Sequence, residues 1–303
     1  MISNHYKGIF YMLLAALGFS VMGGSAKLLK GSFNAGQLVF YRNAVGLIIL
    51  LIGFIVYPPI NKGRKFHLLI FRGMLGTTAL YTLLYCILHI PLGTAMSYNL
   101  TSALFIAIFS FILFREYHGW VVLLAVLLGF GGMLLIYKPA MHFPWYYHAA
   151  GLISGVTSAM AYITLGRLNK YYDARVIVAS FVLTGVLVPL IFMLIRSLAH
   201  LPADDIFFIQ WRWPAGKEWA YVATLGLAAL FGQYFVTRAY GADNAGFVSA
   251  ISYANIIFSV FIGMSLGDAF PDIVSLAGML CIISSGVIIA FEKRKRAPLK
   301  ASV

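Results

Sequence analysis

The sequence predicts an all-α integral membrane protein with ten transmembrane helices, arranged as two inverted five-helix repeats. Composition is the first observation behind this prediction. Of the 303 residues, 61% are hydrophobic and only 10% are charged, whereas a soluble domain carries about 25% charged residues. The second observation is that the apolar runs are continuous, without the alternation of barrel strands. A soluble globular chain and a disordered chain are therefore both excluded.

Ten apolar runs follow one another, each long enough to cross a hydrocarbon core of about 30 Å as a helix. Only helices and closed barrels satisfy every backbone hydrogen bond in a bilayer, so each run is expected to be a helix. The loops left between them are too short for a soluble catalytic domain. The runs cover residues 8–28, 35–57, 68–89, 93–114, 118–137, 149–168, 176–197, 219–239, 246–266 and 273–291.

The distribution of lysine and arginine predicts the orientation in the membrane. If the chain begins inside, fourteen of the 22 basic residues fall on the inner side, six fall outside, and Arg42 and Arg72 lie within spans. This excess predicts that both termini are cytoplasmic in a multi-pass protein of the inner (plasma) membrane. It also accounts for much of the net charge of +13, so membrane lipids rather than nucleic acid are the expected partners.

Weak internal repetition divides the chain in two. Gly8 and Gly151 open corresponding spans, and Lys27 and Lys170 follow them at the same offset. The repeat unit contains five spans, and five is odd, so the second unit must cross the membrane in the opposite sense. Inverted repeats are typical of transporters that bind substrate near the midplane. The expected units are 1–138 and 149–292, followed by a basic cytoplasmic tail at 293–303.

Several features of the sequence together identify a family. Arg42 lies within Leu38-Val39-Phe40-Tyr41-Arg42, and Glu116 closes the fourth span. The run Thr237-Arg238-Ala239-Tyr240-Gly241-Ala242 precedes the ninth span, and the closing span of each half is rich in glycine. On these features, residues 7–292 resemble the EamA-like ten-helix transporters of the drug/metabolite transporter superfamily. The chain departs from the family pattern because neither 93–114 nor 246–266 contains a proline.

The resemblance implies a secondary transporter that works by alternating access. Its implied cargo is an amino acid or a related small polar metabolite, and export is the implied direction. The alternative is a flippase for lipid-linked substrates, or a subunit of one. An enzyme is not expected, because the seven histidines fall in tails, loops or span ends and no HExxH motif occurs. No cofactor or metal is expected, and the sequence does not indicate an oligomeric state.

Arg42 is the most informative candidate for substrate binding. It lies about 12 Å into the second span, close to the midplane, where an arginine must face protein or a wet cavity. Its guanidinium could hold a substrate carboxylate or phosphate. The alternative is that Arg42 bonds carbonyls or polar side chains between helices. Arg72, near the start of the third span, is expected to reach the inner interface, and Lys27 is expected to anchor or gate the outer end of the first.

Polar residues gather at corresponding places in the two halves. Such paired clusters indicate one central cavity, although interhelical hydrogen bonds or aromatic packing would explain the same residues. No carboxylate is found near a midplane, so exchange, facilitated diffusion or coupling through substrate charge is favoured over an acidic proton relay. With Arg42, the predicted substrate-binding residues are Tyr81, Tyr85, Tyr98, Asn99, Ser102, Gln233, Ser252, Tyr253 and Asn255.

Overall fold

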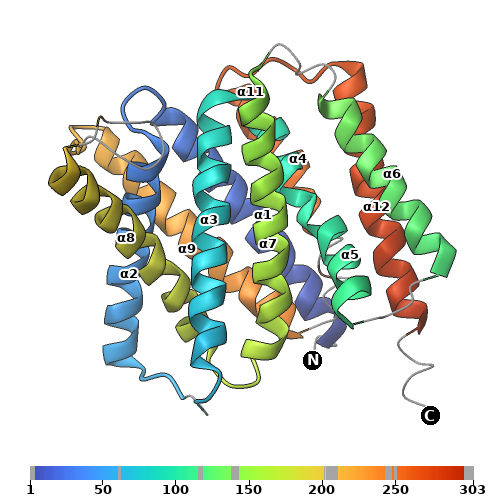
Figure 1. Cartoon of the computed structure of the whole chain (residues 1–303), viewed down its shortest axis with the longest axis horizontal. Coiled ribbons are helices and arrows are strands. Elements are labelled where there is room, and N and C mark those ends of the chain that lie inside the picture. The colour runs from blue at the N-terminus through green and yellow to red at the C-terminus, as the bar shows by residue number, and fades with distance from the viewer. Residues whose placement is uncertain are drawn as a thin grey trace.

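The computed structural model describes residues 4–60, 63–114, 119–137, 143–200, 202, 211–242, 248 and 251–296, and every regular element in that part of the chain is an α-helix (Figure 1). The helices in chain order are α1 (Asn4–Leu28), α2 (Ala35–Val56), α3 (Phe66–His89), α4 (Leu92–Leu100), α5 (Ser102–Phe114), α6 (Gly119–Tyr137), α7 (Trp145–Leu168), α8 (Ala174–Ala199), α9 (Glu218–Ala242), α11 (Ala254–Ser265) and α12 (Ile273–Arg296).

The helices have the length and the surface of membrane spans. Six of those described, namely α1, α2, α3, α7, α8 and α9, are each long and apolar enough to cross a bilayer. Large apolar side chains point away from the bundle on its outer faces, as contact with lipid requires. Examples are Ile55, Leu124, Leu134, Phe261 and Leu280. The predicted membrane-spanning architecture is therefore confirmed.

Two of the ten predicted spans differ from a single continuous helix. Span 93–114 is divided into α4 and α5 at Thr101, and the region of 246–266 is helical at Ile251, turns at Ser252 and Tyr253, and resumes as α11. These two spans occupy corresponding places in the two halves. Paired discontinuous helices of this kind are where transporters build their binding sites.

The break at Thr101 forms without proline. The Thr101 hydroxyl donates to the Tyr98 carbonyl at 2.6 Å, and its backbone N–H donates to the same carbonyl at 3.2 Å. This tight turn replaces the usual hydrogen bond to the carbonyl four residues back. Gly155 of α7 lies directly against the turn, and a Cβ there would overlap the Thr101 hydroxyl. A local side-chain bond and a neighbouring glycine therefore accommodate the interruption.

The two halves interlock, and their contacts are symmetric. Helix α1 packs on α9 and α11 of the second half, and its counterpart α7 packs on α3, α4 and α5 of the first. The pairs α2 with α8 and α6 with α12 each join equivalent helices and lie towards opposite sides of the bundle in Figure 1. Helix α1 begins and α12 ends at the same end of the bundle. An inverted five-helix repeat explains each of these pairings.

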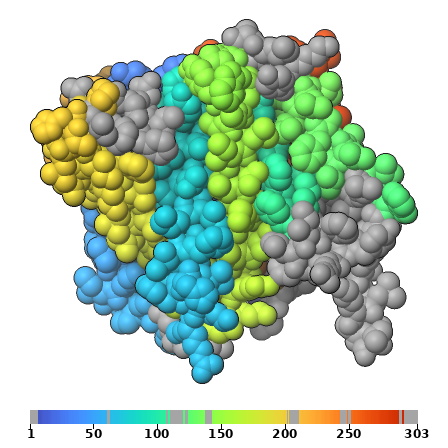
Figure 2. Space-filling model, in the orientation of Figure 1, coloured from blue at the N-terminus to red at the C-terminus, as the bar shows by residue number. Residues whose placement is uncertain are grey.

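Small residues bring the helices of the two halves close together. Gly132 of α6 and Gly278 of α12 face each other so closely that a Cβ on Gly132 would lie 2.6 Å from the carbonyl oxygen of Gly278. Without a hydrophobic driving force between helices, such close backbone approach is a main source of association in a membrane. Figure 2 shows α3 and α7 side by side, their side chains in contact over the middle of one face.

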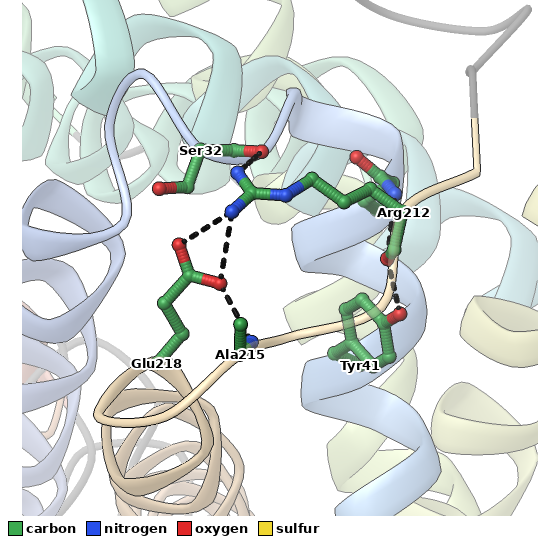
Figure 3. A network of polar contacts seen from close by, with 6 residues as sticks. Ser32, Tyr41, Arg212, Ala215 and Glu218 are labelled. Atoms are coloured by element: carbon green, nitrogen blue, oxygen red, sulfur yellow. Dashed lines mark hydrogen bonds and ion pairs between the residues drawn. The ribbon is translucent and has the colours of Figure 1, made fainter.

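The segment before α9 makes a network of polar contacts with α2 and with the loop that precedes it (Figure 3). The Arg212 carbonyl accepts a hydrogen bond from the Tyr41 hydroxyl at 2.6 Å, and its guanidinium contacts the Ser32 carbonyl and the Glu218 carboxylate. Trp211 packs on Tyr41 with ring centroids 5.4 Å apart. These contacts lie at the end of the bundle that is the outer one in the predicted orientation, and the network ties the second half to α2 there.

Candidate functional site

A cavity lined by both polar and apolar side chains lies in the middle of the bundle. Its described lining comes from both halves, through α1, α2, α3, α4, α5, α7, α8, α9, Ser252 and α11. Its free volume is about 70 Å³, under half of an engineered cavity of about 150 Å³ that binds benzene. This volume has room for a few water molecules, so the bundle must open further to admit a metabolite.

Arg42 enters this cavity from α2 and is 3% exposed. One guanidinium nitrogen donates to the Asn43 Oδ1 atom at 2.9 Å, and Nε contacts the Met22 sulfur at 3.3 Å. Asn43 in turn donates to the Val39 carbonyl at 2.7 Å. These neutral neighbours fix the direction of the side chain without neutralising its charge.

Arg72 is a cavity residue that sequence reasoning missed. We expected it to reach the inner interface, but it is 1% exposed and lines the cavity from α3. Its Nη2 atom donates to the Gln233 Oε1 atom at 3.2 Å, while Nε and Nη1 have no hydrogen-bond partner. Gly76, one helical turn further on, provides the space, because a Cβ there would overlap the guanidinium. A glycine four residues after Arg72 was therefore the feature of the sequence that could have indicated a buried position for Arg72.

The two arginines share one aromatic ring. The guanidinium carbons of Arg42 and Arg72 lie 5.1 Å and 4.7 Å from the ring centroid of Phe181, so they are no more than about 10 Å apart. At an effective dielectric constant of about 20, two positive charges at that separation repel by about 1.7 kcal/mol. None of the cavity-lining residues in the described part of the chain is Asp or Glu. The site is therefore cationic and suited to an anion.

Two asparagines hold the broken spans against the other half. Asn99 of α4 donates to the hydroxyls of Ser154 and Ser158 on α7, at 2.6 and 3.0 Å. Asn255 of α11 donates to the Ala16 carbonyl of α1 at 3.2 Å. Both side chains also line the cavity. The two readings that the sequence left open, cavity lining and interhelical bonding, therefore describe the same residues.

The ten predicted site residues divide into two groups. The cavity brings together Arg42, Asn99, Ser102, Gln233, Ser252 and Asn255, and its lining also includes Tyr162 and Tyr240, whose rings stack at 5.3 Å. The other four tyrosines lie outside the lining, so their role in binding stays a prediction. They are Tyr81, which is buried among core residues, Tyr85, which packs on His89 and Tyr147, Tyr98, which bonds His148, and Tyr253, which packs on Gly286.

A polar contact joins helix ends on the side of the bundle that is the outer one in the predicted orientation. Lys27, in the last turn of α1, forms an ion pair with Asp268, which follows α11. The other carboxylate oxygen of Asp268 accepts the backbone N–H of Leu92 at the start of α4, at 3.0 Å. Both side chains of the pair are about one-eighth exposed. The Asp268 carboxylate therefore ties the ends of α1, α4 and α11. Glu116, the acidic residue expected at the end of span 93–114, lies outside the described residues.

Comparison with known proteins identifies the class. The EamA-like transporter family matches residues 6–138. An uncharacterized transporter of Helicobacter pylori is 30% identical over 93% of this chain and 94% of its own. The pseudopaline exporter CntI of Pseudomonas aeruginosa is 27% identical over 95% and 97%. An S-adenosylmethionine uptake transporter of Rickettsia conorii is 22% identical over 97% and 96%. This chain is a multi-pass membrane transporter and not an enzyme, and it belongs to the EamA-like family of the drug/metabolite transporter superfamily.

Proposed function

We propose that this protein is a secondary transporter that exports amino acids or related small polar metabolites across the inner membrane by alternating access. The observation that carries the proposal is the central cavity, which both halves line and which contains two buried arginines. In this site Arg42 holds the carboxylate of the substrate, while Asn99, Ser102, Ser252 and Asn255 offer hydrogen bonds from the broken spans.

The small volume of the cavity corresponds to an occluded state. The two halves rock about the site, and the breaks at Thr101 and at Ser252 and Tyr253 allow the ends of each span to move separately. Both termini are cytoplasmic in this proposal, as the excess of basic residues on one side predicts. The exporter among the relatives supports outward transport, and the uptake transporter makes direction a quantity to measure directly.

Transport by purified protein in liposomes tests the proposal. Vesicles preloaded with one unlabelled amino acid at a time are assayed for uptake of the same labelled compound, and the same set is screened for thermal stabilisation, since ligand binding raises stability by mass action. We expect a carboxylate-bearing solute to exchange and Arg42→Ala to abolish exchange while the protein stays folded. Unchanged exchange by folded Arg42→Ala would remove Arg42 from the site. Movement of a lipid-linked solute in place of small ones would favour a flippase.

A further inference from the structure

Arg72 offers hydrogen-bond donors that the fold does not use. The side chain is almost completely buried, and only its Nη2 atom is bonded, to the neutral Gln233. The Nε and Nη1 donors have no acceptor, and the Arg72 side chain borders the cavity. Buried polar groups in proteins are nearly always paired, so an unpaired guanidinium edge in a cavity indicates a ligand that supplies the acceptor.

A single anion leaves this site incompletely neutralised. Arg42 and Arg72 come from neighbouring helices and approach the same Phe181 ring, and no carboxylate accompanies them among the described lining residues. If the substrate carboxylate binds Arg42, the charge and two donors of Arg72 are still uncompensated beside the cavity. In a low-dielectric site an uncompensated charge is strongly unfavourable, and a second negative group on the substrate would relieve it.

We propose that Arg72 forms a second anion subsite beside Arg42, so that the preferred substrates are small solutes with two negative charges. This inference rests on the proposed function and narrows its substrate class. The two charges come either from two carboxylates on one solute or from a phosphate monoester, since the planar guanidinium fork binds both groups through paired hydrogen bonds. Gln233 positions the Arg72 fork from α9, and Gly76 leaves room for it within α3.

Glutamate and glutamine test the inference, because they match in size and differ by one negative charge. Affinities are measured on detergent-solubilised protein from ligand-dependent thermal stabilisation and checked by competition for exchange in liposomes. Glutarate, which has two carboxylates and no amine, and O-phosphoserine are the further probes. We expect wild type to prefer glutamate over glutamine by about tenfold or more, the loss that removing one charged hydrogen-bonding partner produces.

Variants then assign the preference to Arg72. In Arg72→Gln the preference for glutamate should fall below about twofold, while Arg72→Lys, which keeps the charge and loses the fork, should be intermediate. Lys170→Gln removes one positive charge from an exposed turn just after α7 and is the matched control, in which the preference should not change. If Arg72→Gln does not fold, the wild-type comparison of glutamate with glutamine still decides.

The outcomes separate this inference from the proposed function. Equal affinity for glutamine and glutamate would overturn the second subsite and leave amino-acid transport standing. Binding of glutarate without any amino acid would support the subsite and overturn the proposed cargo. Stronger binding of O-phosphoserine than of glutamate would support the subsite and assign it to phosphate monoesters. Failure of every dianionic probe to bind folded wild-type protein would overturn the inference.

Discussion

Replacing Asp268 with asparagine should open the outer side of the transporter. Asparagine keeps an oxygen that can accept the Leu92 N–H and loses the attraction to Lys27. Because both side chains of the pair are largely buried, the charged hydrogen bond is worth about 1.5–3 kcal/mol. A loss of about 2 kcal/mol shifts an equilibrium about 30-fold. The ratio of molecules open to the outside to closed molecules should rise by that factor.

A cysteine in the cavity reports this opening. Ser102→Cys is introduced after Cys86 and Cys281 are changed to alanine, and a membrane-impermeant thiol reagent is added from outside to intact cells. Modification should be about 30-fold faster with Asp268→Asn than without it. Asp272→Asn is the control, because Asp272 accepts the N–H groups of Val274 and Ser275 at the start of α12 and asparagine can cap that helix equally well. Equal rates in Asp268→Asn and its parent would refute the gate.

Three further predictions concern stability, each measured by thermal unfolding in detergent. Gly132→Ala should destabilise the protein by about 1–3 kcal/mol, because the new methyl group overlaps the facing backbone of α12, whereas Gly131→Ala on the same helix meets open space and should not. Asn99→Ala should lose about 1 kcal/mol from two interhelical bonds, while Thr78→Ala, which removes a bond within its own exposed helix turn, should lose less; equal losses would contradict this account. Asp173 is the N-cap of α8, where partial burial raises its pKa but hydrogen bonds and charge from the nearby Arg175 outweigh burial and hold the pKa below the usual value of 3.8. Its contribution to stability should therefore be complete above that value and lost as pH falls through the lowered pKa, a loss that Asp173→Asn should not show.

The sequence predicted the membrane spans well because hydropathy is a strong and local signal. The expected spans 35–57 and 68–89 correspond to Ala35–Val56 and Phe66–His89. The breaks were not predictable in the same way, since the apolar character of the chain continues across Thr101 and no proline marks the position. The interruption depends on a hydroxyl that bonds its own backbone and on a glycine of another helix, and neither is visible in the local pattern.

The candidate site was partly predictable for a related physical reason. Arg42 was identified because a charged side chain near the midplane must face protein or a water-filled cavity. Arg72 lies only six residues into α3, a distance from which an arginine can reach the interface. Its depth in the membrane alone therefore led to the wrong prediction that it reaches the inner interface. Whether an arginine at this depth lies in the cavity or at the interface depends on which face of its helix is turned towards the bundle. The same limit applies to the tyrosines, because Tyr98 and Tyr253 are buried against glycines of neighbouring helices and not in the cavity lining.

The contacts that join the two halves also affect how the protein assembles during synthesis. During synthesis the first five spans enter the membrane before α7 has been translated. Until then Asn99 lacks the two serine hydroxyls that it bonds in the finished protein. Helix α1 likewise lacks its packing partners α9 and α11 until late in synthesis, because they are among the last helices to be translated. Asn99 of the first half and Asn255 of the second therefore both depend on bonding groups of the other half. Assembly is therefore expected to be completed only after the last spans insert, and two separately expressed halves should need each other to persist in the membrane.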